Sequence, residues 1–241
     1  MPEDRSILTR PADPPDAVVA YGIDPAQVAD VRYGGGRRPL VVLIHGGFWR
    51  PEIDRAHTGS MTVALAREGW TVAAIEYRSI PRHPDLTADD VALSLDALPG
   101  KVARHDGRVL VMGHSAGGHL ALWAASTRPG VCGALALAPV ADLRLAHALN
   151  LGEGAAPAFL GEDPDRRADL DPKRMPSPAI AVTIVHGDAD EIVPLSVSES
   201  YVTAHPRARL ARLRDVGHFA VIDPVSDAWP TVLAELQRLA G

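Results

Sequence analysis

Apolar residues fall along the chain in short, mostly uninterrupted runs that alternate with stretches of helical spacing. Six runs predict strands, at 40–44, 71–75, 108–112, 134–137, 181–186 and 209–213. Between and after them, apolar residues recur with a helical period over 55–68, 87–98, 116–126, 195–204 and 227–239. Strands that are apolar on both faces suit a parallel sheet covered by helices on both sides. We therefore expect an α/β fold built on a mostly parallel, twisted sheet.

Two segments interrupt this alternation. Residues 1–16 contain four prolines and several charged residues, and we expect them to form an extended N-terminal arm. Residues 141–178 are rich in Asp, Pro and Gly, and they predict a short, lid-like excursion between two strands. A chain of 241 residues suits a single α/β domain, which we place at 17–241.

A glycine-flanked serine lies at the end of the third predicted strand. Gly113-His114-Ser115-Ala116-Gly117 matches the pattern G-x-S-x-G, in which a strand turns sharply into a helix and presents a serine hydroxyl at the edge of the sheet. A Cβ two residues to either side of the serine would collide with the opposite limb of so tight a turn, which explains the glycines. Ser115 is therefore a candidate nucleophile, which needs a histidine base and a carboxylate that orients the base.

Candidate partners for Ser115 follow the last two predicted strands. An acidic loop with Asp188, Asp190 and Glu191 follows 181–186, and Gly217-His218 follows 209–213. Of the ten histidines, only His218 comes after the last strand that follows the acids, so we predict it to be the base. The acidic loop has an alternative interpretation as a solvated turn ahead of a helix.

The loop after the first predicted parallel strand supplies a candidate oxyanion hole. It reads His45-Gly46-Gly47-Phe48-Trp49, and two adjacent glycines let a backbone turn its amides inward. We predict that the amides of Gly47 and Phe48 act with that of Ala116, the residue after the nucleophile at a helix start. An ordinary Gly-Gly turn is the alternative.

Together these motifs resemble those of the α/β-hydrolases of the esterase kind, over residues 29–240. His186-Gly187-x-x-Asp190-x-x-Val193-Pro194 resembles the acid loop of that family. The resemblance implies that Asp190 is the acid, with Asp188 as the second choice and Glu191 as the third.

Two further motifs refine the resemblance. His45-Gly46-Gly47-x-Trp49 is similar to the loop of kynurenine formamidase-like hydrolases, and it departs from the commoner His-Gly-Gly-Gly form at Phe48. Glu76-Tyr77-Arg78 resembles the Asp/Glu-Tyr-Arg turn of the same families. It implies a scaffold in which Arg78 pairs with carboxylates and stiffens the oxyanion loop.

The resemblance implies a serine hydrolase that cleaves small carboxylic esters through a triad and an acyl-enzyme, without a metal or an organic cofactor. An arylformamidase is the main alternative, and a catalytically inactive binding protein on the same fold is an alternative of another class. Peptidases remain open, although the short lid disfavours an oligopeptidase. We expect Trp49, His114 and Phe219 to line a pocket for a small ester or formamide; His114 also lies where it can support the turn at Ser115.

Composition narrows the possible binding partners and the expected location of the protein. The formal charge is −6 and the basic residues are scattered, which argues against nucleic acid as a partner. No apolar run approaches the roughly 20 residues of a membrane-spanning helix. The single cysteine, Cys132, excludes an internal disulfide, and the first residues lack the pattern of a secretory signal, so we expect a cytoplasmic protein. Nothing in the sequence indicates the oligomeric state.

Overall fold

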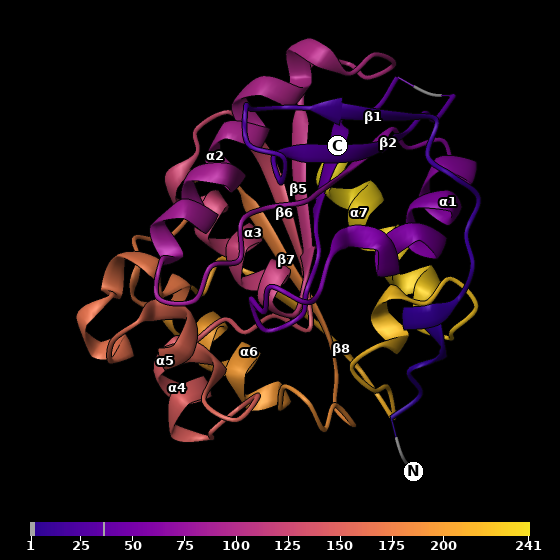
Figure 1. The fold of residues 1–241 in the computed structure, drawn as a ribbon. Helices are drawn as coiled ribbons and strands as arrows, with labels where there is room; N and C mark the ends of the chain where they lie inside the picture. Colours follow the sequence, from indigo (N-terminus) through magenta and orange to yellow (C-terminus); the bar gives the residue numbers. More distant parts are fainter. Residues whose placement is uncertain (1–2, 36) are drawn as a thin grey trace.

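A single twisted sheet organises the protein in the computed structural model, which describes residues 3–35 and 37–241 (Figure 1). The strand order is β1-β2-β4-β3-β5-β6-β7-β8. Strands β1 and β2 are antiparallel to their neighbours, whereas β3 to β8 are parallel to one another. The strands are β1 (Ala17–Ala20), β2 (Val28–Arg32), β3 (Leu40–Ile44), β4 (Val72–Ile75), β5 (Val109–His114), β6 (Val131–Leu137), β7 (Ala181–Gly187) and β8 (Arg209–Leu213). The expected fold class is confirmed.

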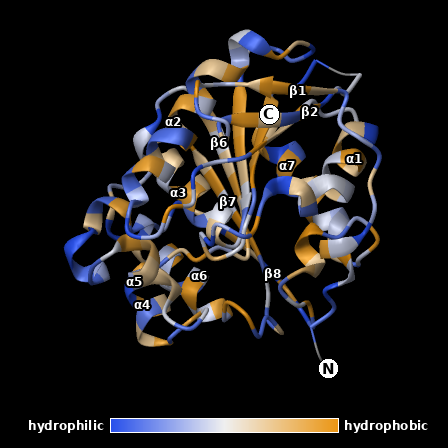
Figure 2. Cartoon of the chain, viewed as in Figure 1, coloured by the Kyte–Doolittle hydropathy of each residue, from blue (hydrophilic) through white to orange (hydrophobic). Residues whose placement is uncertain are grey.

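Helices cover both faces of this sheet (Figure 1). Helices α2 (Pro84–Lys101), α3 (Ala116–Thr127) and α6 (Leu195–Ala204) pack on one face, and α1 (Gly59–Arg67) and α7 (Trp229–Ala240) pack on the other. Successive strand residues divide between the faces: Val42 packs with α2 and α3, and Val41 packs with α1 and α7. Figure 2 shows apolar strands enclosed by helices whose outer sides are hydrophilic. Among the described residues, no helix is long and apolar enough to cross a membrane.

The six predicted strands are all present, and the first and last match their predicted bounds. Strands β1 and β2 were not predicted. Residues of β1 alternate between partly exposed and exposed positions, and those of β2 mostly alternate between partly exposed and buried positions, so both strands lack the continuous buried run that marks the parallel strands. Helix α2 extends through Pro99 to Lys101, beyond the predicted end. The predicted helix over 55–68 begins as a 3-10 turn at Arg55–Thr58 before α1 starts.

The predicted lid folds into short helices that pack onto the domain. It contains α4 (Leu143–Ala148) and α5 (Ala155–Leu160), followed by 3-10 turns at Pro164–Arg166, Ala168–Leu170 and Pro172–Arg174. The carboxylate of Asp142, which is almost fully buried, fixes its start by accepting hydrogen bonds from Lys173 Nζ at 2.8 Å and Ser200 Oγ at 2.6 Å. The segment is therefore held to the domain at its base.

The predicted N-terminal arm is only partly extended. Ser6–Thr9 form a 3-10 helix, and Ile7 is 2% exposed within the apolar cluster that includes α1 and α7. Arg10 forms an ion pair with Asp223, with Nη2 at 2.8 Å from Oδ2. These contacts tie the segment to the C-terminal part of the domain, although its proline-rich composition predicts an extended arm.

A buried histidine links α3 to the insertion. His119 is fully buried, and its Nε2 donates a hydrogen bond to the carbonyl of Leu170 at 2.7 Å. Burial lowers the pKa of His119 to about 4, so the folded protein holds this ring neutral.

This burial predicts a specific loss of stability in acid. Between pH 6.5 and pH 4 the unfolded chain takes up a proton at His119 that the folded chain does not, so the free energy of unfolding falls as the pH falls. The His119 contribution amounts to roughly 2 kcal/mol between pH 7 and pH 5. His119→Gln keeps an amide donor for Leu170 and should show a correspondingly smaller fall in urea unfolding experiments. His147→Gln, at an exposed position, is the matched control; an equal fall in wild type and His119→Gln contradicts this account.

Candidate active site

Ser115 occupies a strained turn between β5 and α3. Its backbone has φ 55° and ψ −118°, a conformation that costs a non-glycine residue about 1–3 kcal/mol. A Cβ on Gly113 would lie 2.1 Å from the carbonyl oxygen of Gly117, and a Cβ on Gly117 would lie 2.1 Å from that of Ile44. The two glycines therefore let backbone approach backbone, as the sequence pattern predicts.

Asp190 and His218 are brought together from the loops after β7 and β8. Asp190 Oδ2 accepts a hydrogen bond from His218 Nδ1 at 2.6 Å, and both side chains are almost completely buried. Because Nδ1 donates to the carboxylate, the neutral ring leaves Nε2 with a free lone pair, as a general base requires.

The environment of Asp190 keeps its carboxylate ionised. Burial alone raises its pKa, but hydrogen bonds from His186 and His218 outweigh burial and hold the pKa well below the usual range. The other carboxylate oxygen accepts the amides of Ile192 and Val193, both at 2.8 Å. An ionised acid in this position fixes the orientation of the His218 ring.

The other two acids of this loop face elsewhere. Asp188 Oδ1 accepts the amide of Asp215 at 2.7 Å, and Asp188 Oδ2 lies 3.4 Å from Arg212. Glu191 lines the cavity described below, and no hydrogen bond joins it to His218 within the described ranges. Of the three candidates, Asp190 is the one that contacts the histidine.

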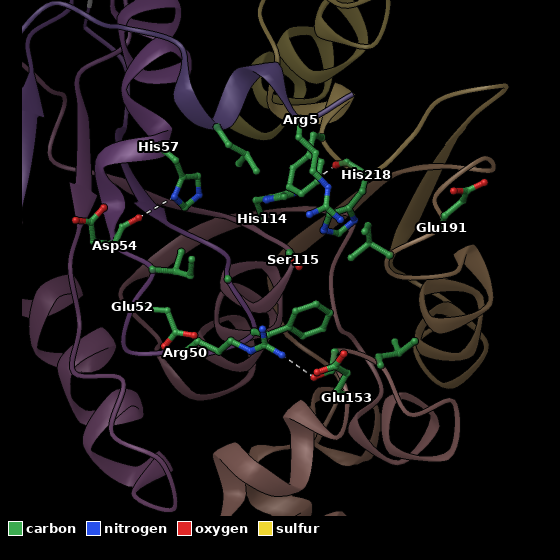
Figure 3. Close-up of a pocket in the computed structure, with 18 of the residues that line it drawn as sticks. Arg5, Arg50, Glu52, Asp54, His57, His114, Ser115, Glu153, Glu191 and His218 are labelled. Atoms are coloured by element: carbon green, nitrogen blue, oxygen red, sulfur yellow. Dashed lines mark hydrogen bonds between the residues drawn. The ribbon is translucent and has the colours of Figure 1, made fainter. Parts of the chain in front are cut away.

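Ser115 and His218 line one cavity of about 860 Å³. Figure 3 shows both side chains at this cavity, with His114 beside them. In the part of the chain that the structure describes, no hydrogen bond joins the Ser115 hydroxyl to His218. The shared cavity is thus the observation that brings these two residues together.

The predicted oxyanion loop presents free amides. Gly47, Phe48 and Trp49 have consecutive positive φ values of 118°, 52° and 54°, which turn the backbone sharply after β3. Within the described residues, no acceptor is hydrogen-bonded to the amides of Gly47, Phe48 or Ala116. Gly46 lies close to the nucleophile, since a Cβ there would be 3.0 Å from Ser115 Cβ. The loop and the serine turn are therefore neighbours.

A polar network behind this loop fixes its shape. His45 Nε2 lies 2.9 Å from a carboxylate oxygen of Glu76, His45 Nδ1 lies 2.8 Å from the Gly46 carbonyl oxygen, and the Tyr77 hydroxyl donates to the His45 carbonyl at 3.0 Å. The expected carboxylate pairing of Arg78 is present: its guanidinium contacts Asp90 at 2.6 and 2.8 Å. Asp90, however, belongs to α2, so Arg78 does not stiffen the oxyanion loop as expected. Glu76 and Tyr77 hold that loop instead.

The structure places two of the three predicted pocket residues at the cavity. His114 and Phe219 line the cavity, whereas Trp49 does not. The Trp49 indole is 3% exposed and stacks on Phe159 of α5, with ring centroids 4.6 Å apart. Trp49 packs against the insertion instead of lining the cavity, so its predicted role as a pocket wall is wrong.

His114 supports the base directly. Its Nε2 donates a hydrogen bond to the backbone carbonyl of His218 at 3.0 Å. Burial, aided by the neighbouring His218 ring, lowers the pKa of His114 well below its usual value, so this imidazole stays neutral. It therefore anchors the His218 backbone and also forms part of the cavity wall.

Sequence reasoning missed most of the cavity wall. The N-terminal segment contributes Arg5 and Leu8, and the loop after β3 contributes Arg50, Glu52, Ile53, Asp54, Ala56 and His57. The insertion adds 150–153, and Glu191 and Ile192 complete the lining with the residues named above. No motif marks these positions. Across residues 3–35 and 37–241, no three His, Cys, Asp or Glu side chains cluster in a way that could bind a metal ion.

Comparison with known proteins places the chain in a family. Residues 30–130 match the BD-FAE family model, and residues 81–208, more than half of the chain, match the model of the prolyl oligopeptidase family. This chain is an α/β-hydrolase of the prolyl oligopeptidase family. The α/β-hydrolase is 32% identical to the pimeloyl-[acyl-carrier protein] methyl ester esterase of Aromatoleum aromaticum over 234 residues, which cover 75% of this chain and 91% of that protein.

Other relatives of this α/β-hydrolase are formamidases and esterases. The kynurenine formamidase of Danio rerio is 28% identical over 207 residues, covering 78% of this chain and 68% of that protein. A truncated carbohydrate esterase from gut microbiota shares the fold with a TM-score of 0.77 at 18% identity, over 92% of this chain and 95% of the other. The chain is therefore a hydrolase enzyme of the esterase and formamidase kind.

The packing at the serine turn gives a direct test of the site's architecture. Gly117→Ala should lower the free energy of unfolding by roughly 3 kcal/mol, because its Cβ has no room beside the Ile44 carbonyl. Gly130→Ala is the matched control, since no atom lies within 4 Å of a Cβ there, and it should change stability by less than about 0.5 kcal/mol. Equal effects of the two variants in urea unfolding would show that the close approach is not a constraint.

Proposed function

We propose that the protein is a serine hydrolase of small carboxylic esters, with Ser115 as nucleophile, His218 as general base and Asp190 as the acid that orients it. The observation that carries this proposal is the 2.6 Å hydrogen bond from His218 Nδ1 to Asp190, with His218 lining the same cavity as Ser115. The free amides of Gly47, Phe48 and Ala116 support it, because they can serve as donors to an oxyanion.

The proposed reaction proceeds through an acyl-enzyme. His218 Nε2 takes the hydroxyl proton as Ser115 Oγ attacks the ester carbonyl, and the oxyanion accepts hydrogen bonds from the three amides. Collapse of the tetrahedral intermediate breaks the ester bond, and His218 gives its proton to the departing oxygen, which leaves as an alcohol. Water, activated by His218, then releases the acid from Ser115. Asp190 stabilises the imidazolium that forms in each half of the reaction.

Arylformamidase activity is the second candidate. The His45-Gly46-Gly47-Phe48-Trp49 loop and the similarity to kynurenine formamidases favour it. Formamide hydrolysis would use the same residues, with His218 protonating an amine in place of an alcohol. Parallel assays with p-nitrophenyl acetate and N-formylkynurenine separate the candidates, because a much higher kcat/KM for the formamide identifies a formamidase.

The nucleophile is tested by Ser115→Ala. The variant should lose about 10⁴-fold or more in kcat towards p-nitrophenyl acetate, since only the hydroxyl can form the acyl-enzyme. Its free energy of unfolding should stay close to that of wild type, because the hydroxyl makes no hydrogen bond within the described structure. Turnover at a tenth of the wild-type rate would rule out the serine mechanism.

The acid is tested by a pair of isosteric variants in one loop. Asp190→Asn should lower kcat on the order of 10⁴-fold, because the amide no longer fixes the tautomer of His218. Asp188→Asn should have little effect on kcat, because Asp188 contacts Asp215 and Arg212 instead of the histidine. The reverse ranking in steady-state kinetics would refute the assignment of Asp190.

A further inference from the structure

The N-terminal segment forms part of the wall of the catalytic cavity. Glu3 Oε1 accepts the backbone amide of Phe219 at 3.0 Å, which fixes the segment just after His218. On the other side, Ile7 is buried and Arg10 is paired with Asp223. Arg5 lies between these attachment points and lines the cavity. The segment thus holds Arg5 at a defined place beside the proposed base.

Arg5 presents an unneutralised guanidinium there. Its Cζ lies over the Phe219 ring, 5.7 Å from the centroid, and the Phe219 ring lies edge-to-face with His218, with centroids 5.1 Å apart. Within residues 3–35 and 37–241, Arg5 makes no side-chain hydrogen bond and no ion pair. By contrast, Arg10 of the same segment is paired with a carboxylate. Figure 3 shows the Arg5 side chain reaching toward His218 at the cavity.

The carboxylates that line the cavity do not neutralise Arg5. They belong to the loop after β3, to the insertion and to the acid loop, and none lies within 4 Å of the Arg5 nitrogens among the described residues; they are Glu52, Asp54, Glu153 and Glu191. In Figure 3, Glu52 and Glu153 lie near Arg50, away from Arg5 and His218. The charge of Arg5 therefore faces the cavity on the side of the proposed base.

We propose that Arg5 binds a carboxylate carried by the leaving group of the substrate. This inference rests on the proposed function, in which His218 protonates the departing oxygen, so the leaving group must lie on the His218 side of Ser115. A guanidinium has a planar fork of N–H donors that matches a carboxylate. The cation–π contact with Phe219 holds the guanidinium beside His218, and no described residue accepts a hydrogen bond from its N–H groups, which leaves them available to a ligand. The favoured substrates are then esters of hydroxy acids or of carboxyphenols.

Two acetate esters of matched size test this role. 4-Acetoxybenzoate carries a carboxylate on its leaving group, and 4-acetoxybenzamide carries a neutral amide in the same position. Wild type should show a higher kcat/KM for the benzoate ester, mainly through a lower KM. Raising the salt concentration should reduce this preference, because Arg5 is exposed and its charge is screened.

Arg5→Gln should reduce the ratio of the two kcat/KM values by about tenfold or more, the usual effect of losing a charge-assisted hydrogen bond. Arg5→Lys should restore part of the ratio, because it keeps the charge without the fork. Arg214→Gln is the control: it removes the same charge from a side chain that is 88% exposed and outside the cavity lining, and it should leave the ratio unchanged.

The outcomes separate the two proposals. A wild-type enzyme that hydrolyses both esters without preference, or a ratio that Arg5→Gln does not change, overturns the role of Arg5 alone. An equal loss for both esters in Arg5→Gln also overturns it, because that result indicates a general effect on the segment. Hydrolysis of neither ester by wild type overturns the proposed function and, with it, the role of Arg5.

Discussion

The close approach of the start of α3 to the ends of β3 and β5 is the constraint on which the site depends. At this point backbone meets backbone, so that neither Gly113 nor Gly117 has room for a Cβ. The same contact accompanies the positive φ of Ser115 and the start of α3 immediately after it, where the Ala116 amide has no hydrogen-bond acceptor among the described residues. It also brings the loop after β3 against the serine. The strain at Ser115 persists because packing on both sides leaves the chain no alternative.

Buried polar side chains hold the rest of the site around this turn. Each makes hydrogen bonds that fix one neighbour: Asp190 orients His218, His114 binds the His218 carbonyl, and His45 with Glu76 braces the oxyanion loop. Because an unpaired buried polar group is costly, these contacts allow few other arrangements. The partners of Asp190 and His114 explain why the first stays ionised and the second stays neutral. Hydrogen bonds offset the burial of the carboxylate, whereas burial dominates for the imidazole.

Sequence patterns were sufficient for the parallel core and for the order of the candidate residues. Buried parallel strands are continuous apolar runs, and the carboxyl ends of such strands meet at one edge of the sheet, so Ser115 and His218 could be placed together. The antiparallel strands β1 and β2 alternate in side-chain exposure along the chain and were missed. The choice between Asp188 and Asp190 rested on a family resemblance, because both acids follow β7. In the structure, the hydrogen bonds of the two carboxylates show which of them contacts His218.

Side-chain direction and long-range packing were not predictable from local pattern. Trp49 packs on Phe159 of the insertion, away from the cavity, and its backbone has a positive φ that no propensity indicates for tryptophan. Arg5 reaches the cavity through contacts with residues more than two hundred positions away, such as that of Glu3 with Phe219. Proline-rich composition suggested an extended arm, and it carried no information about what that arm would pack against. Contacts of this kind depend on the assembled fold.

The most direct test of the account is covalent labelling with a fluorophosphonate, which reacts with activated serine nucleophiles. Intact-mass spectrometry should show a single adduct, peptide mapping should place it on Ser115, and the Ser115→Ala protein should remain unmodified under the same conditions. Labelling should proceed in step with loss of ester hydrolysis. An adduct on another residue, or complete hydrolytic activity in a fully labelled protein, would contradict the assignment of Ser115 as the nucleophile.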